Sequence, residues 1–273
     1  MVINTNIAAS VGASNLNKST NLLNESLARL SSGSKIVNAS DDPAGLAESM
    51  TLTAEIGQTN AANSNVSNAV SLLQTQDGYL QQVGSALDQM ATLAVQAQDV
   101  TKTPSEIADY QKEFNTLAGY INDVASKTFN GVSLFSNTAL AVTTDSAGGT
   151  FSMTGVDLGG TNYTAATGTA ANGSDAISLT TASNGALNAV TQAITQLAQD
   201  RATVGASEER LTYTGNELGV LSNNLSAAKS QITDVNVAEE STNYAKYQIL
   251  VQAGTSMLAQ ANQNPQSVLK LLQ

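Results

Sequence analysis

Apolar residues recur every seven positions along much of this chain. Stepping by seven from Leu52 to Ala94, six of the seven positions are apolar, and Thr59 is the exception. Rows with the same spacing are Leu16, Leu23 and Leu30 near one end, and Leu211, Leu218, Leu225 and Ile232 toward the other. A seven-residue repeat that persists this long keeps one stripe of each helix facing a partner helix. The pattern therefore predicts long, paired helices.

The three prolines of the chain each stand where a helix could begin. Asp42-Pro43 has a capping residue followed by Pro at the first helical position. Thr103-Pro104-Ser105-Glu106 has the spacing of a capping box, and Asn264-Pro265 predicts a third start. Nothing forces a break within residues 43–99, so we expect one helix there of roughly 85 Å, at about 1.5 Å per residue.

The middle of the chain differs from both flanks. Residues 138–186 are dominated by Thr, Ala, Gly, Ser and Asn. Apolar and polar residues alternate over Phe151–Val156 and again over Ile177–Thr180, which predicts short strands. So few large apolar side chains cannot build a separate core. We therefore predict a mainly α fold, a long antiparallel helical bundle or coiled coil formed by the N- and C-terminal segments, with a small β-hairpin and loop insertion in the middle.

The helical faces away from the apolar rows carry few charges. Only 12% of the residues are charged, against roughly 25% in typical soluble domains. A solvated coiled coil normally carries Glu and Lys beside its seam, whereas these faces carry Asn, Gln, Ser and Thr. An ordinary coiled coil remains one interpretation of the periodicity. The uncharged flanks favour a second one, in which neighbouring subunits cover them.

Both ends of the chain are apolar, although chain ends are usually polar and frayed. Such segments either pack within the subunit or await another copy of the chain. The candidate subunit-interface residues are Ile3, Ile7, Val11, Leu16, Leu23, Leu27, Leu30, Ile249, Leu250, Val251, Met257, Leu258, Val268, Leu269 and Leu272.

Composition removes most catalytic and nucleic-acid functions. The chain has no Cys and no His, which excludes thiol nucleophiles, Cys/His zinc sites and histidine acid–base chemistry. A net charge of −11 has the wrong sign for binding a phosphate backbone. No apolar run reaches the length of about 18 residues that spans a membrane, and the first residues do not resemble a cleaved signal peptide.

Carboxylate catalysis stays open on composition alone. It would need two acidic side chains brought close together. Asp145, Asp157 and Asp175 lie far apart in the low-complexity middle, so we interpret them as solvated loop charges. Asp41-Asp42 and Glu239-Glu240 are interpreted as helix caps and exposed faces. We predict no enzyme activity, no cofactor and no metal.

Several linked motifs, in the same order at both ends, resemble those of the bacterial flagellins. They are Leu16–Ser19, Leu27–Gly33, Ile36 and Asn38–Gly45 near the N-terminus, Thr128–Val132 at the turn into the hairpin, and Asn223–Ser230, Gln248–Leu250, Gln252–Gln263, Pro265–Gln266 and Val268–Leu269 near the C-terminus. The resemblance covers roughly residues 1–157 and 186–273.

This resemblance implies a structural subunit that polymerises into the extracellular filament of the bacterial flagellum for motility. It implies five segments: an N-terminal inner-core helix (1–42), the N-terminal part of an outer-core domain with its hairpin (43–157), a short variable surface insertion (158–185), the C-terminal part of the outer core (186–234) and a C-terminal inner-core helix (235–273). Implied partners are other copies, a flagellar export chaperone, the filament cap and the hook–filament junction proteins. Export would use the flagellar type III system.

Two alternatives arise within the resemblance. One is a flagellin-like hook–filament junction protein, which shares the terminal motifs. The other is a flagellin with an inserted zinc peptidase, whose paired His this chain lacks. In addition, Gln231 and Asn236 stand where many relatives carry Arg and Asp, which puts one inter-helix ion pair in doubt.

The segment from Leu87 to Gln96 aligns with the patch that the vertebrate Toll-like receptor for flagellin contacts in stimulatory relatives. Leu93–Gln96 matches that pattern. Strongly stimulatory relatives place two arginines and a glutamate where this chain has Gln89, Ala91 and Thr92. Because charged hydrogen bonds contribute more than neutral ones, the resemblance implies weak receptor recognition.

Overall fold

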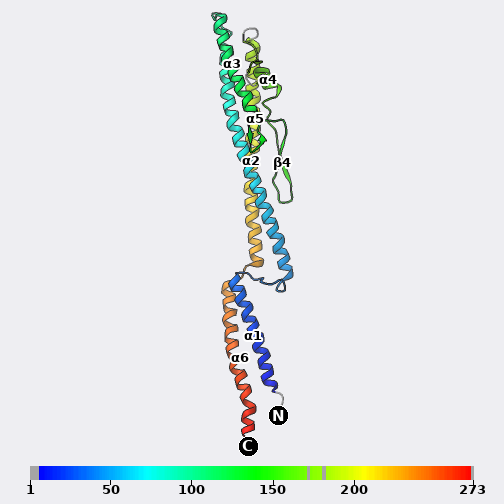
Figure 1. Cartoon of the computed structure of the whole chain (residues 1–273). Helices are drawn as coiled ribbons and strands as arrows, with labels where there is room; N and C mark the ends of the chain where they lie inside the picture. The colour runs from blue at the N-terminus through cyan, green and yellow to red at the C-terminus, as the bar shows by residue number, and fades with distance from the viewer. Residues whose placement is uncertain (1–5, 171–172, 180–182, 272–273) are drawn as a thin grey trace. The chain divides into compact units, whose positions relative to one another are not determined.

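The structure, a computed structural model, describes residues 6–170, 173–179 and 183–271, with side chains at 183 and 264–271 left aside. Within these residues the chain is mainly helical, as predicted, with two small antiparallel strand pairs in the middle. The elements are α1 (Ile7–Ser32), α2 (Pro43–Gln96), α3 (Pro104–Ala125), β1 (Thr128–Phe129), β2 (Val132–Ser133), β3 (Leu140–Thr143), β4 (Thr150–Met153), α4 (Thr161–Thr167), α5 (Ser183–Thr233) and α6 (Val237–Leu271) (Figure 1).

The chain forms two compact units. Unit 1 takes in Met1–Ile56 and Asn223–Gln273, and unit 2 takes in Gly57–Ser222. The five-segment division expected from the sequence stays a prediction.

Two of the three helix starts predicted at prolines are confirmed. Asp42 Oδ1 accepts a hydrogen bond from the backbone N–H of Gly45 at 2.9 Å, and α2 begins at Pro43. Thr103 and Glu106 form the capping box at the start of α3. The third prediction is wrong, because α6 continues through residue 265. A proline removes one backbone donor from a helix, and the bonds on either side of it can hold the helix together.

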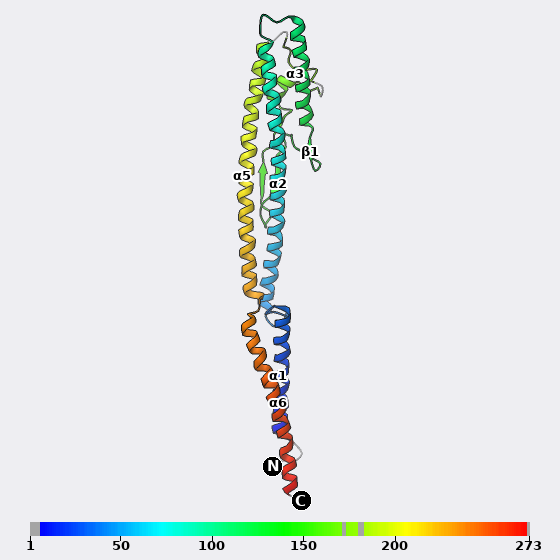
Figure 2. The ribbon, with the colours of Figure 1, turned by 90° about the vertical axis from the view of Figure 1, so that its left-hand side faces the viewer.

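The core of unit 2 lies along the heptad row predicted on α2. From Thr59 to Ala94 every position of this row is at most 2% exposed. Val204, Leu211 and Leu218 form the matching buried stripe on α5. Figures 1 and 2 show α2 and α5 side by side through unit 2. The periodicity therefore identified the two helices that pack together.

Polar contacts fix the alignment of α2 with α5. Arg201 pairs with both carboxylate oxygens of Asp77, at 2.8 and 3.2 Å. Gln74 donates to Glu208 at 2.8 Å. Near the end of the unit, Ser222 donates to Asn60 at 2.9 Å. These contacts are exposed, so they select the register of the helices more than they stabilise them.

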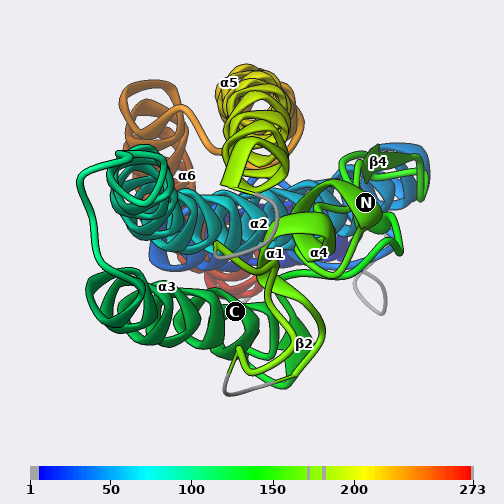
Figure 3. The ribbon, with the colours of Figure 1, turned by 90° about the horizontal axis from the view of Figure 1, so that it is seen from above.

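The segment after the hairpins joins this core, although its composition predicted a surface loop. Tyr163 on α4 is buried, and its hydroxyl donates to Asp200 at 2.6 Å. Burial, followed by this hydrogen bond, raises the pKa of Tyr163 above its usual value. Viewed from above, α4 lies beside α2, α3 and α5 (Figure 3).

The predicted strand at Ile177–Thr180 is wrong over its described residues, 177–179. Gln111 on α3 accepts from the backbone N–H of Leu179 at 2.6 Å, and Ile177 donates to the Ala166 carbonyl at 3.4 Å. Leu179 is buried, as the alternation indicates, but residues of helices α3 and α4, rather than a neighbouring strand, provide the hydrogen-bond partners of this backbone. Thr180 lies outside the described residues.

The two strand pairs are short hairpins. β1 and β2 are joined by Asn130 and Gly131, which have φ of 48° and 81°. Positive φ at both central residues is the geometry of a two-residue type I′ turn, for which Asn-Gly is the preferred sequence. The β3–β4 pair confirms the strand predicted to begin at Phe151, which ends at Met153.

We predict that Leu87→Ala destabilises the protein by about 2–5 kcal/mol, because Leu87 is fully buried and its loss leaves a cavity. Val95→Ala on the same helix is the control, and its side chain is 54% exposed, so the expected change is within about 0.5 kcal/mol. Urea unfolding followed by circular dichroism measures both. Equal unfolding midpoints for the two variants would contradict the assigned core.

Candidate functional site

The helices of the two chain ends, α1 and α6, pair antiparallel within unit 1 (Figures 1 and 2). The Asn6 side chain donates to the Ala261 carbonyl at 2.8 Å near the start of α1. At the far end of the pair, Ser26 lies against Glu240. The two ends of the chain are thus brought together, as the sequence predicted.

Small residues line part of the seam between these helices. Gly254 on α6 faces Leu16, and a Cβ at Gly254 would lie 3.2 Å from Leu16 Cδ1. Such a contact is tight, so glycine lets the two helices approach closely. On α1, Gly12 and Ser26 stand two heptads apart on the seam, next to the leucine row. These small residues form a second row along the seam, and a search for large apolar residues does not find it.

A polar pair is buried in the same seam. The Ser26 hydroxyl donates to the Glu240 carboxylate, and the two residues are 2% and 8% exposed. The sequence interpretation of Glu240 as an exposed charge is therefore wrong. The partner of Glu240 is 214 positions away in the chain, so the residues around Glu240 do not show that it is buried. The one indication in the sequence is that Glu240 stands two heptads before Gly254 and so shares its face of the helix.

The candidate interface residues fall into two groups. Those that are half-buried within unit 1 are Leu16, Leu23, Leu30, Val251 and Leu258. Those that are exposed are Ile7, Val11, Leu27, Ile249, Leu250 and Met257, and the exposure of Ile7, Ile249 and Met257 reaches 67–70%. The α1–α6 pair therefore covers one side of each helix and leaves large apolar side chains uncovered on the other.

Four candidates cannot be placed. Ile3 and Leu272 lie outside the described residues. Val268 and Leu269 belong to the end of α6, where side chains are not described. Their assignment to the interface stays a prediction.

The buried apolar core lies entirely outside unit 1. Among the described residues, every fully buried apolar side chain lies between Ala62 and Leu218, in unit 2. The buried residues of unit 1 include Ser26, Ser49 and Glu240, which are polar. The described residues of unit 1 thus form no apolar core of the kind that normally stabilises a folded unit of its size.

The connection from α1 to α2 and the connection from α5 to α6 lie against each other within unit 1. The segment after α1 pairs with the segment after α5 through a bridge between Ser34 and Asp234. Lys35 donates its backbone N–H to the Thr233 carbonyl at 2.6 Å, and Val235 donates to Gly33 at 3.1 Å. Hydrogen bonds from Ser230, and then from Thr233, hold the pKa of Asp234 below its usual value.

Gln231 and Asn236 stand where many relatives carry the Arg and Asp of an inter-helix ion pair. In the described part of unit 1, no other ion pair between helices takes its place. Both side chains are exposed. Arg29 pairs within its own helix, with Glu25, and no ion pair among the described residues joins α1 to α6. The serine–glutamate contact supplies a polar link between these helices instead.

The residues of the expected receptor patch are not equally accessible. Gln89 is exposed and donates to Glu113 on α3 at 2.7 Å, while Thr92 and Gln96 are exposed on α2. Ala91 is half-buried, and Leu93 is only 5% exposed. In this fold Leu93 is a core residue and offers little surface to a partner.

Neither a metal cluster nor a membrane-spanning helix is found among the described residues. Searching them finds no group of three or more His, Cys, Asp or Glu side chains placed to hold a metal ion. Within the same residues, no helix is both long and apolar enough to cross a membrane. The feature that stands out is the uncovered apolar surface of α1 and α6.

These features define a class of long-helix proteins whose terminal helices pair with each other and still expose apolar side chains. Family models match most of the chain: the bacterial flagellin N-terminal helical region matches residues 3–139, and the C-terminal helical region matches residues 187–272. The chain therefore belongs to the bacterial flagellin family.

Individual relatives match along their whole length. The chain is 35% identical to a flagellin of Halalkalibacterium halodurans over 273 residues, and 34% identical to the flagellar filament 33 kDa core protein of Treponema phagedenis over 285 residues. Each match covers 100% of both chains. The crystal structure of Bacillus cereus flagellin is 26% identical, with a TM-score of 0.49, and the match covers 61% of this chain and 94% of that one.

Proposed function

We propose that this chain is a structural subunit that polymerises into the helical filament of a bacterial flagellum and so serves swimming motility. One observation carries the proposal. Among the described residues, the terminal helices pair within unit 1 without a buried apolar core there, while seven of their large apolar side chains stay exposed. Other copies of the chain supply the missing cover.

The free energy gained by covering these side chains is large enough for copies of the chain to assemble. Burying one side chain the size of Leu contributes roughly 1.5–3 kcal/mol. Ile249, Leu250 and Met257 lie close together in the sequence of α6, and Ile7 and Val11 are one turn apart on α1. Covering most of them in a contact offsets the cost of association, estimated at about 4–15 kcal/mol.

The relatives favour a filament subunit over a hook–filament junction protein. Those named above are a flagellin and a flagellar filament core protein. The two roles differ in abundance, since a filament subunit dominates sheared surface appendages and a junction protein does not. We therefore propose an extracellular location in the filament and a structural role without catalysis, cofactor, nucleic acid or membrane.

Further partners follow from the exposed ends. The same apolar surface would associate in the cytoplasm before assembly, so we propose a dedicated flagellar chaperone that covers it and export through the flagellar type III system. In the finished flagellum, the filament cap and the hook–filament junction proteins are the proposed neighbours at the two ends of the polymer.

The first prediction from the proposed function concerns assembly. The double variant Ile249→Ser, Met257→Ser removes two exposed apolar side chains without touching the core. It should stay helical and soluble and raise the critical concentration for seeded elongation at least 100-fold, since each lost contact is worth roughly 1.5–3 kcal/mol. Val100→Ser is the control, being 98% exposed in unit 2. Light scattering measures elongation, and normal elongation by the double variant would refute the proposal.

A second prediction concerns the chaperone. Its candidate anchors are Leu250, Leu258, Val268 and Leu269, at spacings that fit one helix. Deleting residues 244–273 should abolish co-purification with a small helical partner expressed together with the chain. Val100→Ser should bind as the unmodified chain does. Binding that survives the deletion would place the chaperone site elsewhere.

A third prediction concerns immune recognition, for which we propose weak activation of the vertebrate Toll-like receptor. Gln89 and Thr92 are neutral, and Leu93 is buried. In a receptor-reporter assay on monomer, the double variant Gln89→Arg, Ala91→Arg should raise potency about tenfold or more. Thr116→Arg on α3 adds a charge elsewhere and controls for charge alone. Strong signalling by the unmodified monomer would contradict this prediction.

A further inference from the structure

The hydroxyl of Thr59 is the exception among the hydroxyl groups of α2. Each of the other Ser and Thr residues of this helix donates a hydrogen bond to a carbonyl three or four positions earlier in the same helix. The Thr59 hydroxyl has no hydrogen-bond partner among the described residues, although the residue is 0% exposed. A buried hydroxyl without a partner disfavours the closed helix pair, because opening the pair gives it water to bond.

Two helical glycines lie near the level of Thr59, Gly57 on α2 and Gly219 on α5. Ser222 on α5 donates to Asn60 on α2 at 2.9 Å, and each glycine stands three positions before one of these two residues. A Cβ at either glycine would meet nothing within 4 Å, so packing does not require glycine there. Glycine inside a helix loses more backbone freedom on folding than alanine does. Both helices are therefore weakened near the same level.

The apolar core of unit 2 does not reach these residues. Its buried side chains begin at Ala62 on α2 and end at Leu218 on α5. Unit 2 itself extends from Gly57 to Ser222. A short stretch of each helix thus belongs to unit 2 without belonging to its core.

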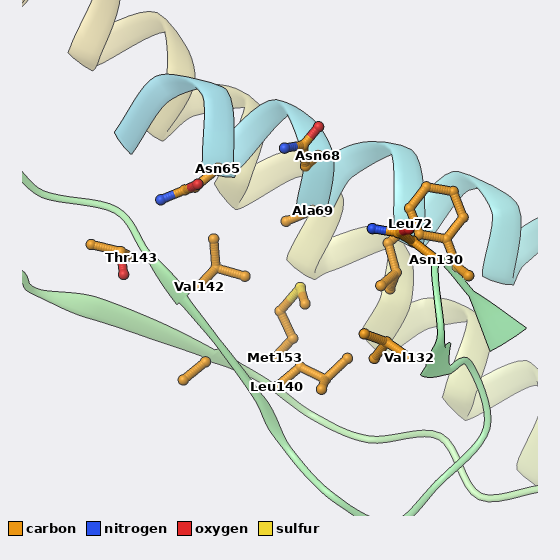
Figure 4. Close-up of a pocket in the computed structure, with 12 residues that line it drawn as sticks. Asn65, Asn68, Ala69, Leu72, Asn130, Val132, Leu140, Val142, Thr143 and Met153 are labelled. Carbon is orange, nitrogen blue, oxygen red and sulfur yellow. The ribbon is translucent and has the colours of Figure 1, made fainter. Parts of the chain in front are cut away.

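The hairpins cover α2 further along the helix. Leu140 and Met153 of the β3–β4 hairpin line one groove together with Ala69 and Leu72 of α2, and Figure 4 shows the two hairpin side chains pointing toward α2. Within residues 57–61, by contrast, every residue except Thr59 is exposed. Opening this stretch of α2 therefore uncovers little apolar surface.

We infer that residues 57–61 of α2 and 219–222 of α5 form a joint that opens locally while the core of unit 2 stays closed. Opening gives the Thr59 hydroxyl water as a partner and returns backbone freedom to the two glycines. Segments with few buried apolar contacts and exposed hydrogen bonds are those that open first in folded proteins. The joint has both properties, because the bond from Ser222 to Asn60 is exposed.

The joint has a consequence for assembly, and this consequence rests on the proposed function. Helices α2 and α5 continue through the joint into unit 1. Because the two helices can bend where they open, other copies can cover the terminal helices without disturbing the core of unit 2. The local opening itself is a property of the single chain and does not depend on a filament.

Hydrogen exchange of the full-length monomer tests whether the unpaired hydroxyl promotes opening. Thr59→Val removes the hydroxyl and keeps a branched side chain of similar size, so it should raise the protection of residues 57–61 at least fivefold. Thr75→Val is the matched control, because the Thr75 hydroxyl donates to the Ser71 carbonyl at 2.8 Å. The control should leave the protection of residues 57–61 unchanged.

A second matched pair distinguishes local opening from unfolding of the whole unit. Gly57 and Gly78 both lie in α2, and a Cβ at either would meet nothing within 4 Å. Replacing either glycine by alanine should stabilise the surrounding helix by a factor of about five. With a local joint, Gly57→Ala raises the protection of residues 57–61 and Gly78→Ala does not. Equal effects of the two variants would mean that residues 57–61 open only with the whole unit, and would overturn the inference.

Seeded elongation tests the consequence for assembly. The triple variant Gly57→Ala, Thr59→Val, Gly219→Ala should keep the circular dichroism of the unmodified chain and elongate seeds at least tenfold more slowly, because its joint opens less often. Gly78→Ala is the control and should elongate as the unmodified chain does. Normal elongation by the triple variant, with protection raised at the joint, would overturn the role in assembly.

The outcomes separate the joint from the proposed function. If the unmodified chain does not elongate seeds, the proposed function fails, and hydrogen exchange of the monomer still decides whether the joint exists. If Thr59→Val and Thr75→Val monomers show equal protection at residues 57–61, the joint is overturned even when filaments form normally.

Discussion

Two helices packed side by side can cover only one stripe of each other, and the ends of this chain form such a pair. Leu16 and Leu258 are half-covered by the contact between α1 and α6, whereas Ile7, Ile249 and Met257 face away from it. In unit 2, α3, α4 and two hairpins pack around α2 and α5 and cover more of their surface. Unit 1 adds nothing comparable within the described residues, so its apolar surface requires other molecules.

Much of the fold follows from periodicity and capping. Leu73, Leu80 and Leu87 were predicted to face a partner helix because they recur every seven residues, and all three are buried. The Thr103 capping box also acts locally, within four residues. Features of this kind are visible in sequence because the residues that cause them are neighbours along the chain.

Two of the wrong predictions, those at Glu240 and at Ile177–Leu179, share a different origin. Glu240 looked exposed because a lone carboxylate is rarely buried, yet Ser26 from the opposite end of the chain supplies its partner. The alternation at Ile177–Leu179 resembled a strand, but Gln111 on α3 satisfies its backbone. The interface candidates share an apolar character and a place near the ends, and only the packing of α1 on α6 separates those half-buried within the subunit from those left exposed. Long-range contacts of this kind leave no local signal.

Hydrogen exchange in monomer and filament tests most directly whether other copies complete the terminal helices. The backbone amides of α1 and α6 should exchange rapidly in the monomer, where no buried apolar core supports them, and slow at least 100-fold in the filament. The amides of α2 and α5 within residues 62–97 and 186–218 should be protected in both states. Equal protection of α1 and α6 in monomer and filament would contradict the account.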